Sequence, residues 1–219
     1  LIGRLRRLEH RGPDQQNTWS NKHIWMGHQR LVLLGGEETG QQPLVNSSGD
    51  ALVYNGEIYN CQELQSKYLS SSFLSDSEIL FALLNTCGSS IIPQLRGMFS
   101  FVYYKCDENQ VWLVRDPFGM KPLYYKQIEE GWEFSSEIRG FEDLEPDPIQ
   151  AEIFHHHMAP LPGYSLYKEV FEIRPGCMKI IDSNGERSQH YVNLGSVFSK
   201  AQNINSESSS VRVDDKYFN

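Results

Sequence analysis

Residues 98–135 read MFSFVYYKCDENQVWLVRDPFGMKPLYYKQIEEGWEFS, and this stretch decides the fold class. Four runs rich in aromatic and β-branched residues predict four strands, at 98–104, 111–115, 123–126 and 132–135. Turn signals at Asp116-Pro117-Phe118-Gly119 and Glu129-Glu130-Gly131 separate the later runs. Short consecutive strands with tight turns between them favour antiparallel pairing.

The flanking sequence adds further strands. Residues 177–182 and 187–192 flank Asn184-Gly185, which is the strongest short hairpin signal. Residues 24–34 and 51–54 are also rich in strand-forming residues, and a glycine-bearing loop at 35–49 separates them.

Two helices are predicted towards the N-terminus. Leu1, Leu5 and Leu8 recur at the spacing of one apolar helical face, and Gly12-Pro13 ends that pattern. Ser75 and Glu78 have the spacing of a capping box ahead of a helix at 77–87, and Gly88 stands where a helix ends with positive φ. Helices and short strands that do not alternate as βαβ units predict an α+β domain.

Composition limits the class of protein. The 219 residues are 39% hydrophobic and 22% charged, which is typical of a globular chain. A formal net charge of −8 argues against a nucleic-acid or anionic-membrane binder. No apolar run reaches the roughly 18 residues that span a bilayer, and no secretory leader is seen. Four widely spaced cysteines form no Cys-x-x-Cys pair, so we expect a reducing, cytoplasmic location.

Asn55-Gly56-Glu57 is the first candidate site. It follows the apolar residues 52–54, so we expect an amide, an unhindered backbone N–H and a carboxylate at a strand end. An amide donor beside a glycine N–H is what an oxyanion hole requires. The alternative interpretation is a type I′ hairpin turn with a charged neighbour.

Arg30 and Asp76 are the other candidates. Arg30 ends a strand-like run and offers a planar fork to a carboxylate, although a single arginine is usually a surface residue. Asp76 lies at a predicted helix N-terminus, where a carboxylate usually serves as a cap. Together, Arg30, Glu57 and Asp76 complement the carboxylate and ammonium of a free α-amino acid.

Other motifs carry less chemistry. His155-His156-His157 cannot all face one ion from a helix or strand, so no metal site is predicted. The isolated histidines His10 and His28 are more often structural than catalytic. No glycine-rich phosphate loop is present, so no cofactor is expected in this segment.

Read in order, the motifs resemble those of the glutamine-hydrolysing domain of glutamine-dependent asparagine synthetases, a class II (N-terminal nucleophile) amidotransferase. The resemblance covers roughly residues 5–176. It is carried by these segments: His10-Arg11-Gly12-Pro13-Asp14, His28-Gln29-Arg30-Leu31, Gln42-Pro43, Tyr54-Asn55-Gly56-Glu57-Ile58-Tyr59-Asn60, Ser75-Asp76-Ser77-Glu78, Leu95-Arg96-Gly97-Met98-Phe99-Ser100-Phe101, Arg115-Asp116-Pro117-Phe118-Gly119-Met120-Lys121-Pro122-Leu123-Tyr124 and Phe134-Ser135-Ser136-Glu137.

This resemblance implies a four-layer αββα sandwich of two antiparallel sheets, the Ntn-hydrolase fold. It also implies that the substrate is glutamine. Arg30 would hold the α-carboxylate, with backbone groups of Leu33 and Leu34 lining the same pocket. Glu57 and Asp76 would take the α-ammonium, and the Asn55 amide and Gly56 N–H would form the oxyanion hole.

The nucleophile of the family is an N-terminal Cys, whose α-amine activates the thiol. Relatives carry it on a first strand some 20 residues further upstream of the His-Arg-Gly-Pro-Asp motif than Leu1 is. We therefore expect an N-terminally truncated domain that lacks its first strand, binds glutamine at best, and exposes a groove or sheet edge. Internal cysteines cannot substitute, because their nitrogens are amides. The alternative is an inactive glutamine-binding or scaffold module.

We expect the amidotransferase domain to span 1–195, a Ser-rich linker 196–213, and a further domain to begin at 214–219. The resemblance implies a C-terminal synthetase domain in cis that uses ATP and Mg²⁺ to amidate aspartate, although relatives serve other acceptors. The expected partner is glutamine, with no nucleic acid and no membrane, and homodimerisation is left open.

Overall fold

The structure, a computed structural model, describes residues 1–31, 40–73 and 75–192. Its centre is a six-stranded antiparallel sheet in the order β11-β10-β6-β5-β4-β3. The strands of this sheet are β3 (Leu44–Val45), β4 (Ala51–Ile58), β5 (Gly97–Lys105), β6 (Gln110–Arg115), β10 (Cys177–Asp182) and β11 (Gly185–His190).

Two smaller antiparallel sheets form a second layer. One pairs β1 (Gln15–Ser20) with β2 (Trp25–Arg30). The other has the order β8-β7-β9 and consists of β7 (Tyr124–Ile128), β8 (Gly131–Ser135) and β9 (Val170–Glu172). The predicted α+β sandwich of antiparallel sheets is confirmed, but its second sheet is divided into these two parts.

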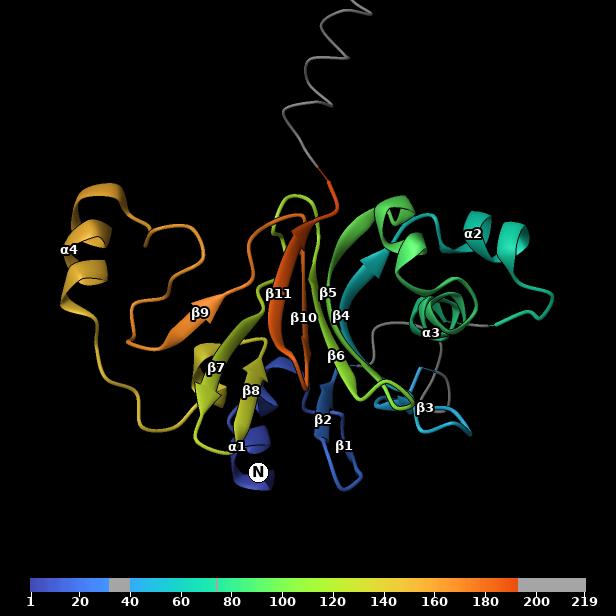
Figure 1. The fold of residues 1–219 in the computed structure, drawn as a ribbon, viewed down its shortest axis with the longest axis horizontal. Coiled ribbons are helices and arrows are strands. Elements are labelled where there is room, and N and C mark those ends of the chain that lie inside the picture. The colour runs from blue at the N-terminus through green and yellow to red at the C-terminus, as the bar shows by residue number, and fades with distance from the viewer. Residues whose placement is uncertain (32–39, 74, 193–219) are drawn as a thin grey trace, which may run out of the picture.

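Helices cover the other face of the six-stranded sheet (Figure 1). These are α2 (Cys61–Tyr68) and α3 (Asp76–Cys87), followed by the 3₁₀ segment Gly88–Gln94. Near the small sheets lie α1 (Ile2–Arg6) and the 3₁₀ segments Glu9–Arg11 and Ile138–Gly140, while α4 (Pro148–His157) stands apart from the sheets.

The core follows from strand alternation in β5, because successive side chains point to opposite faces. Phe99, Phe101 and Tyr103 belong to the apolar cluster beneath α3. Val102 and Tyr104 belong to a second cluster, which packs against the small sheets. The central strand β5 is therefore buried on both faces, which explains why its sequence is almost continuously apolar.

Several local predictions are confirmed. Ser75 caps α3 with a complete capping box to Glu78, and Gly88 ends the helix at φ +61°. The 177–192 hairpin forms, with Asp182 paired to Gly185. The four strands of residues 98–135 appear as β5 to β8.

Other predictions were wrong or incomplete. The helix predicted from Leu1 to Leu8 is shorter, because α1 ends at Arg6 and a separate 3₁₀ turn follows at Glu9–Arg11. The predicted loop at 35–49 contains β3. The sequence did not predict β1, whose exposure alternates along a polar run, or α2, whose only buried residue is Leu64. The expected linker and the 214–219 segment lie outside the described residues.

Candidate active site

The candidate site begins where β4 loses its neighbour β3. β3 begins at Leu44, opposite Leu52, so the described residues provide no strand beside β4 after Leu52. Side-chain oxygens accept the hydrogen bonds of this strand edge instead. The Tyr54 N–H donates to the buried Gln42 Oε1 at 2.6 Å, and the Ile58 N–H donates to Asp76 Oδ2 at 3.3 Å.

Gly56 lies between these two donors on the same edge. Its partner across the ladder is Phe99, whose own N–H and C=O are both bonded to Asp116. Gly56 and Phe99 therefore form a non-hydrogen-bonded pair, and the Gly56 N–H points to the open edge. Gly56 has φ +146°, and a Cβ at this position would lie 2.1 Å from the Met98 carbonyl oxygen. Only glycine fits here, which leaves its N–H unhindered.

Asn55 provides the second donor. Its side-chain Nδ2 is buried and has no hydrogen-bond partner in the part of the chain that the structure describes. Buried polar atoms are nearly always paired, so among the described residues this amide is an exceptional donor. Both Asn55 and Gly56 lie inside β4, which continues to Ile58. The alternative of a type I′ turn was wrong, because pairing with β5 extends past the Asn-Gly step to Ile58 and Gly97.

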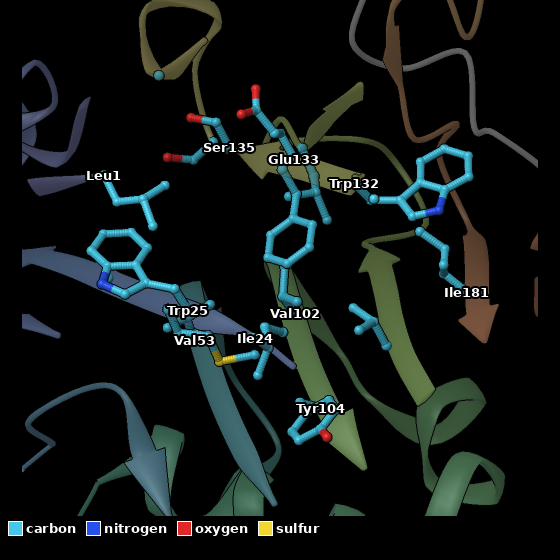
Figure 2. A pocket seen from close by; sticks show the side chains of 18 of the residues that line it. Leu1, Ile24, Trp25, Val53, Val102, Tyr104, Trp132, Glu133, Ser135 and Ile181 are labelled. Carbon is cyan, nitrogen blue, oxygen red and sulfur yellow. The ribbon is translucent and has the colours of Figure 1, made fainter. Parts of the chain in front are cut away.

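Asn55 borders a groove of about 560 Å³ between the two parts of the second layer. Figure 2 shows Trp25 of β2 on one side, Trp132 of β8 on the other, and Val53 and Val102 of the six-stranded sheet below. Both β2 and β8 are edge strands, each paired to one neighbour among the described residues. Most of the side chains that line the groove are apolar. On two sides the groove is bordered by the unpaired edges of β2 and β8. This agrees with the expected exposed edge and groove.

Arg30 ends β2, and its backbone is fixed from the N-terminal side. Pro13 forms a parallel bridge with Arg30, and the Asp14 N–H donates to the Arg30 carbonyl oxygen at 3.1 Å. The guanidinium Nη1 donates to Gln15 Oε1 at 2.9 Å. Arg30 is half-buried at this strand end.

Asp76 is the first residue of α3, and Ser75 is the residue that caps the helix. Asp76 Oδ1 does accept from the Ser77 N–H in the first turn at 2.8 Å, but helix capping is not its sole interaction. Its Oδ2 accepts from the Tyr54 hydroxyl at 2.6 Å, which joins the helix to β4. Glu57 is exposed on β4 next to Gly56. Leu33 and Leu34 lie outside the described residues.

Sequence reasoning gave no role in the site to three residues that support it: His28, Gln42 and Tyr54. The His28 ring hydrogen-bonds to the Tyr54 backbone from β2, and burial together with Arg30 lowers the pKa of His28 to about 4. Neutral His28 thus links the two layers, as expected for a structural histidine. One sequence signal could have identified Gln42 and Tyr54 as supporting residues: both lie within the quoted family motifs.

The other flagged motifs lie away from the groove. His155, His156 and His157 form the exposed last turn of α4, where His156 contacts Glu152 at 3.0 Å. Within residues 1–31, 40–73 and 75–192, no three His, Cys, Asp or Glu side chains are grouped to hold a metal ion. The helices described here are too short or too polar to cross a membrane.

An antiparallel α+β sandwich of the Ntn-hydrolase type, with a buried amide at its groove and a glycine N–H on the adjoining strand edge, is typical of the amidotransferase class. Residues 1–192 match the family model for the glutamine amidotransferase domain, and the chain belongs to this family.

The curated relatives are several times longer than the region they share with this chain. Glutamine-hydrolyzing asparagine synthetase 1 of Bacillus subtilis (strain 168) is 31% identical over 188 residues, which cover 82% of this chain and 30% of that protein. The asparagine synthetase of Zea mays is 37% identical over 148 residues, covering 65% and 25%. Amidase chry2 of Gibberella zeae is 31% identical over 192 residues, covering 84% and 28%. The matched region thus spans between a quarter and a third of these three relatives.

Solved structures show the same fold. The glutamine phosphoribosylpyrophosphate amidotransferase from B. subtilis has a TM-score of 0.60 at 22% identity, covering 86% of this chain and 45% of that one. The allosteric regulatory enzyme of purine biosynthesis has a TM-score of 0.54 at 24% identity, covering 76% and 34%. These likenesses support the sandwich architecture.

Proposed function

We propose that this chain is the glutaminase part of an asparagine-synthetase-like amidotransferase, which hydrolyses glutamine to glutamate and ammonia. The observation that carries the proposal is the buried Asn55 Nδ2, which has no partner among the described residues. An unpaired buried donor costs about 1–3 kcal/mol, so its presence is explained if it donates to a substrate oxygen. The Gly56 N–H at the neighbouring open edge supplies the second donor.

The nucleophile in this proposal is a cysteine at the start of an extended segment that occupies the groove. Support comes from the open edges of β2 and β8, which border a space lined by apolar side chains. An extended segment would pair with both edges and join the two parts of the second layer into one sheet.

The chemistry follows from the donors. The thiol loses its proton to the cysteine α-amine and its sulfur attacks the glutamine γ-carbonyl carbon. Negative charge develops on the carbonyl oxygen, where Asn55 and Gly56 donate. The C–N bond then breaks as the leaving nitrogen takes the proton from the α-amine. Ammonia departs, and the cysteine sulfur remains bound to the glutamyl group as a thioester. Water hydrolyses the thioester to give glutamate and regenerate the thiol.

The amino-acid end of glutamine carries two opposite charges, and the candidate residues match both. Arg30 would pair with the α-carboxylate, beside backbone groups of Leu33 and Leu34. Asp76 and Glu57 would pair with the α-ammonium. The carboxylates of Asp76 and Glu57 belong to neighbouring elements, because Asp76 is hydrogen-bonded to Ile58 on β4.

The acceptor side of the reaction belongs to the rest of the full-length protein. We propose a synthetase domain in cis that uses ATP and Mg²⁺ to amidate aspartate with the released ammonia. The support is that the relatives named asparagine synthetases extend far beyond the region matched here. A relative named as an amidase makes a different acceptor the alternative.

The first test is the binding of glutamine, measured by calorimetry on the purified chain and on Arg30→Ala. Loss of a desolvated, charge-assisted pair should weaken binding by roughly 2 kcal/mol, about thirtyfold. Arg174→Ala is the matched control, because Arg174 is exposed and lines a different pocket, together with Tyr164 and His190. Unchanged affinity in Arg30→Ala would remove the carboxylate assignment.

The second test is the intact mass and N-terminal sequence of the protein from its native source, together with an ammonia-release assay. An N-terminal Cys and glutamine-dependent ammonia release are expected. Native protein that has another first residue and releases no ammonia would overturn the proposal and favour an inactive glutamine-binding module.

A further inference from the structure

We infer that Tyr54 is a positioning residue for recognition of the substrate α-ammonium, because its hydroxyl orients the carboxylate of Asp76. This inference rests on the proposed function and deepens it. The hydroxyl lies 2.6 Å from Asp76 Oδ2, and only 5% of Tyr54 is exposed.

The hydroxyl is a dedicated donor. The Tyr54 ring is part of the apolar cluster beneath α3, which leaves its oxygen little access to water. Burial and the charge of Asp76 raise the pKa of Tyr54 well above its usual value, so the hydroxyl keeps its proton. A donor fixed in this way specifies one orientation of its acceptor.

Among the described residues, three donors hold the Asp76 carboxylate. Its Oδ2 accepts from the Tyr54 hydroxyl and the Ile58 N–H, and its Oδ1 accepts from the Ser77 N–H at 2.8 Å. A carboxylate has about four acceptor positions, so one position is left for a ligand N–H. Among the three donors, the Tyr54 hydroxyl makes the shortest contact and is the only side chain.

Tyr54 also links the two ends of the site. Its N–H is held by Gln42 and its backbone also bonds to the His28 ring, while the next two residues, Asn55 and Gly56, supply the oxyanion donors. One residue therefore sets the position of Asp76 relative to these donors. Glutamine presents its ammonium and γ-carbonyl at a fixed covalent separation, so this relative position determines which amino-acid amide fits.

The test compares glutamine with glutaramate, which is glutamine without the α-amino group. Calorimetry on the wild-type chain should show tighter binding of glutamine. Tyr54→Phe should weaken glutamine binding roughly tenfold, because hydrogen bonds to charged groups are among the stronger ones. Tyr54→Phe should leave glutaramate binding unchanged, because glutaramate has no ammonium group to pair with Asp76.

Tyr103→Phe is the matched control. Tyr103 lies on β5 and, like Tyr54, is a buried tyrosine of the apolar cluster beneath α3. Its hydroxyl donates to Asn85 Oδ1 at 2.8 Å rather than to Asp76. This variant loses one buried hydroxyl but should keep the wild-type preference for glutamine. Melting temperatures of both variants check that each is folded under the assay conditions.

A double-mutant cycle supplies the second measurement. In an Asp76→Asn background, Tyr54→Phe should have no further effect on the glutamine-to-glutaramate ratio. Equal weakening of both ligands by Tyr54→Phe, or unchanged glutamine affinity, would overturn the inference and leave the proposed function standing. A wild-type chain that binds neither ligand, or binds both equally, would overturn the proposed function itself and the inference with it.

Discussion

Gly12 packs directly against the backbone of Arg30: a Cβ on Gly12 would lie 2.5 Å from both the Arg30 nitrogen and its carbonyl carbon. Gly12 has φ −163°, which any residue can adopt, so close approach is what requires glycine here. The His10-Arg11-Gly12-Pro13-Asp14 motif therefore contributes to the site indirectly, because it fixes the end of β2 from which Arg30 projects.

Gly12→Ala should displace the Arg30 backbone and lower the free energy of unfolding by about 1–3 kcal/mol, as expected for overpacking. Urea unfolding measures the stability, and glutamine binding should weaken in parallel. Gly3→Ala is the control, because Gly3 lies in α1 with open space around its Cβ position. That change should be neutral or should stabilise by up to about 1 kcal/mol.

Gly56→Ala should be more damaging than Gly131→Ala, although the two glycines have similar φ values of +146° and +142°. Both alanines carry backbone strain of about 1–3 kcal/mol. Only at Gly56 does the new Cβ also meet backbone, 2.1 Å from the Met98 oxygen, whereas nothing lies within 4 Å at Gly131. Thermal unfolding of both variants measures the difference. Equal destabilisation would show that strain alone requires glycine at position 56.

Asn55→Leu should increase stability by about 1 kcal/mol, because it removes a buried amide that has an unpaired Nδ2. In the complete enzyme the same change should lower kcat about 10²–10³-fold through loss of an oxyanion donor. Gln150→Leu is the control, since this buried amide accepts from the Leu161 N–H at 3.0 Å and should destabilise the chain when removed. A destabilising Asn55→Leu would mean that the amide has a structural partner.

Stability should fall as the pH is lowered from about 6.5 to about 4. The pKa of His28 is lowered to about 4 by burial and by Arg30, so over this range the unfolded chain binds a proton that the folded chain does not. The unfolding free energy should therefore rise with pH, by roughly 2–3 kcal/mol across the window from this group. His28→Gln should flatten this part of the profile, whereas His157→Gln, an exposed position on α4, should not.

Local sequence was sufficient where a signal and its structural outcome lie within a few residues. The Ser75 to Glu78 capping box predicted the start of α3, and Asn184-Gly185 predicted the hairpin of β10 and β11. The same Asn-Gly signal at Asn55-Gly56 was misleading, because β5 offers a partner across the full length of β4 and no turn forms. Ladder pairing with a distant segment overrode the local preference.

For the proposed site, the sequence indicated which residues are the candidates: Arg30, Asn55, Gly56, Glu57 and Asp76 all lie in the quoted motifs. Only the tertiary structure decided how these residues are arranged. The short β3 opens the edge of β4, Gln42 and Tyr54 connect that edge to Asp76, and the division of the second layer creates the groove that Asn55 borders. The physical reason is that residue type sets donor, acceptor and charge, whereas burial and an unpaired strand edge arise only when segments far apart in the chain pack together.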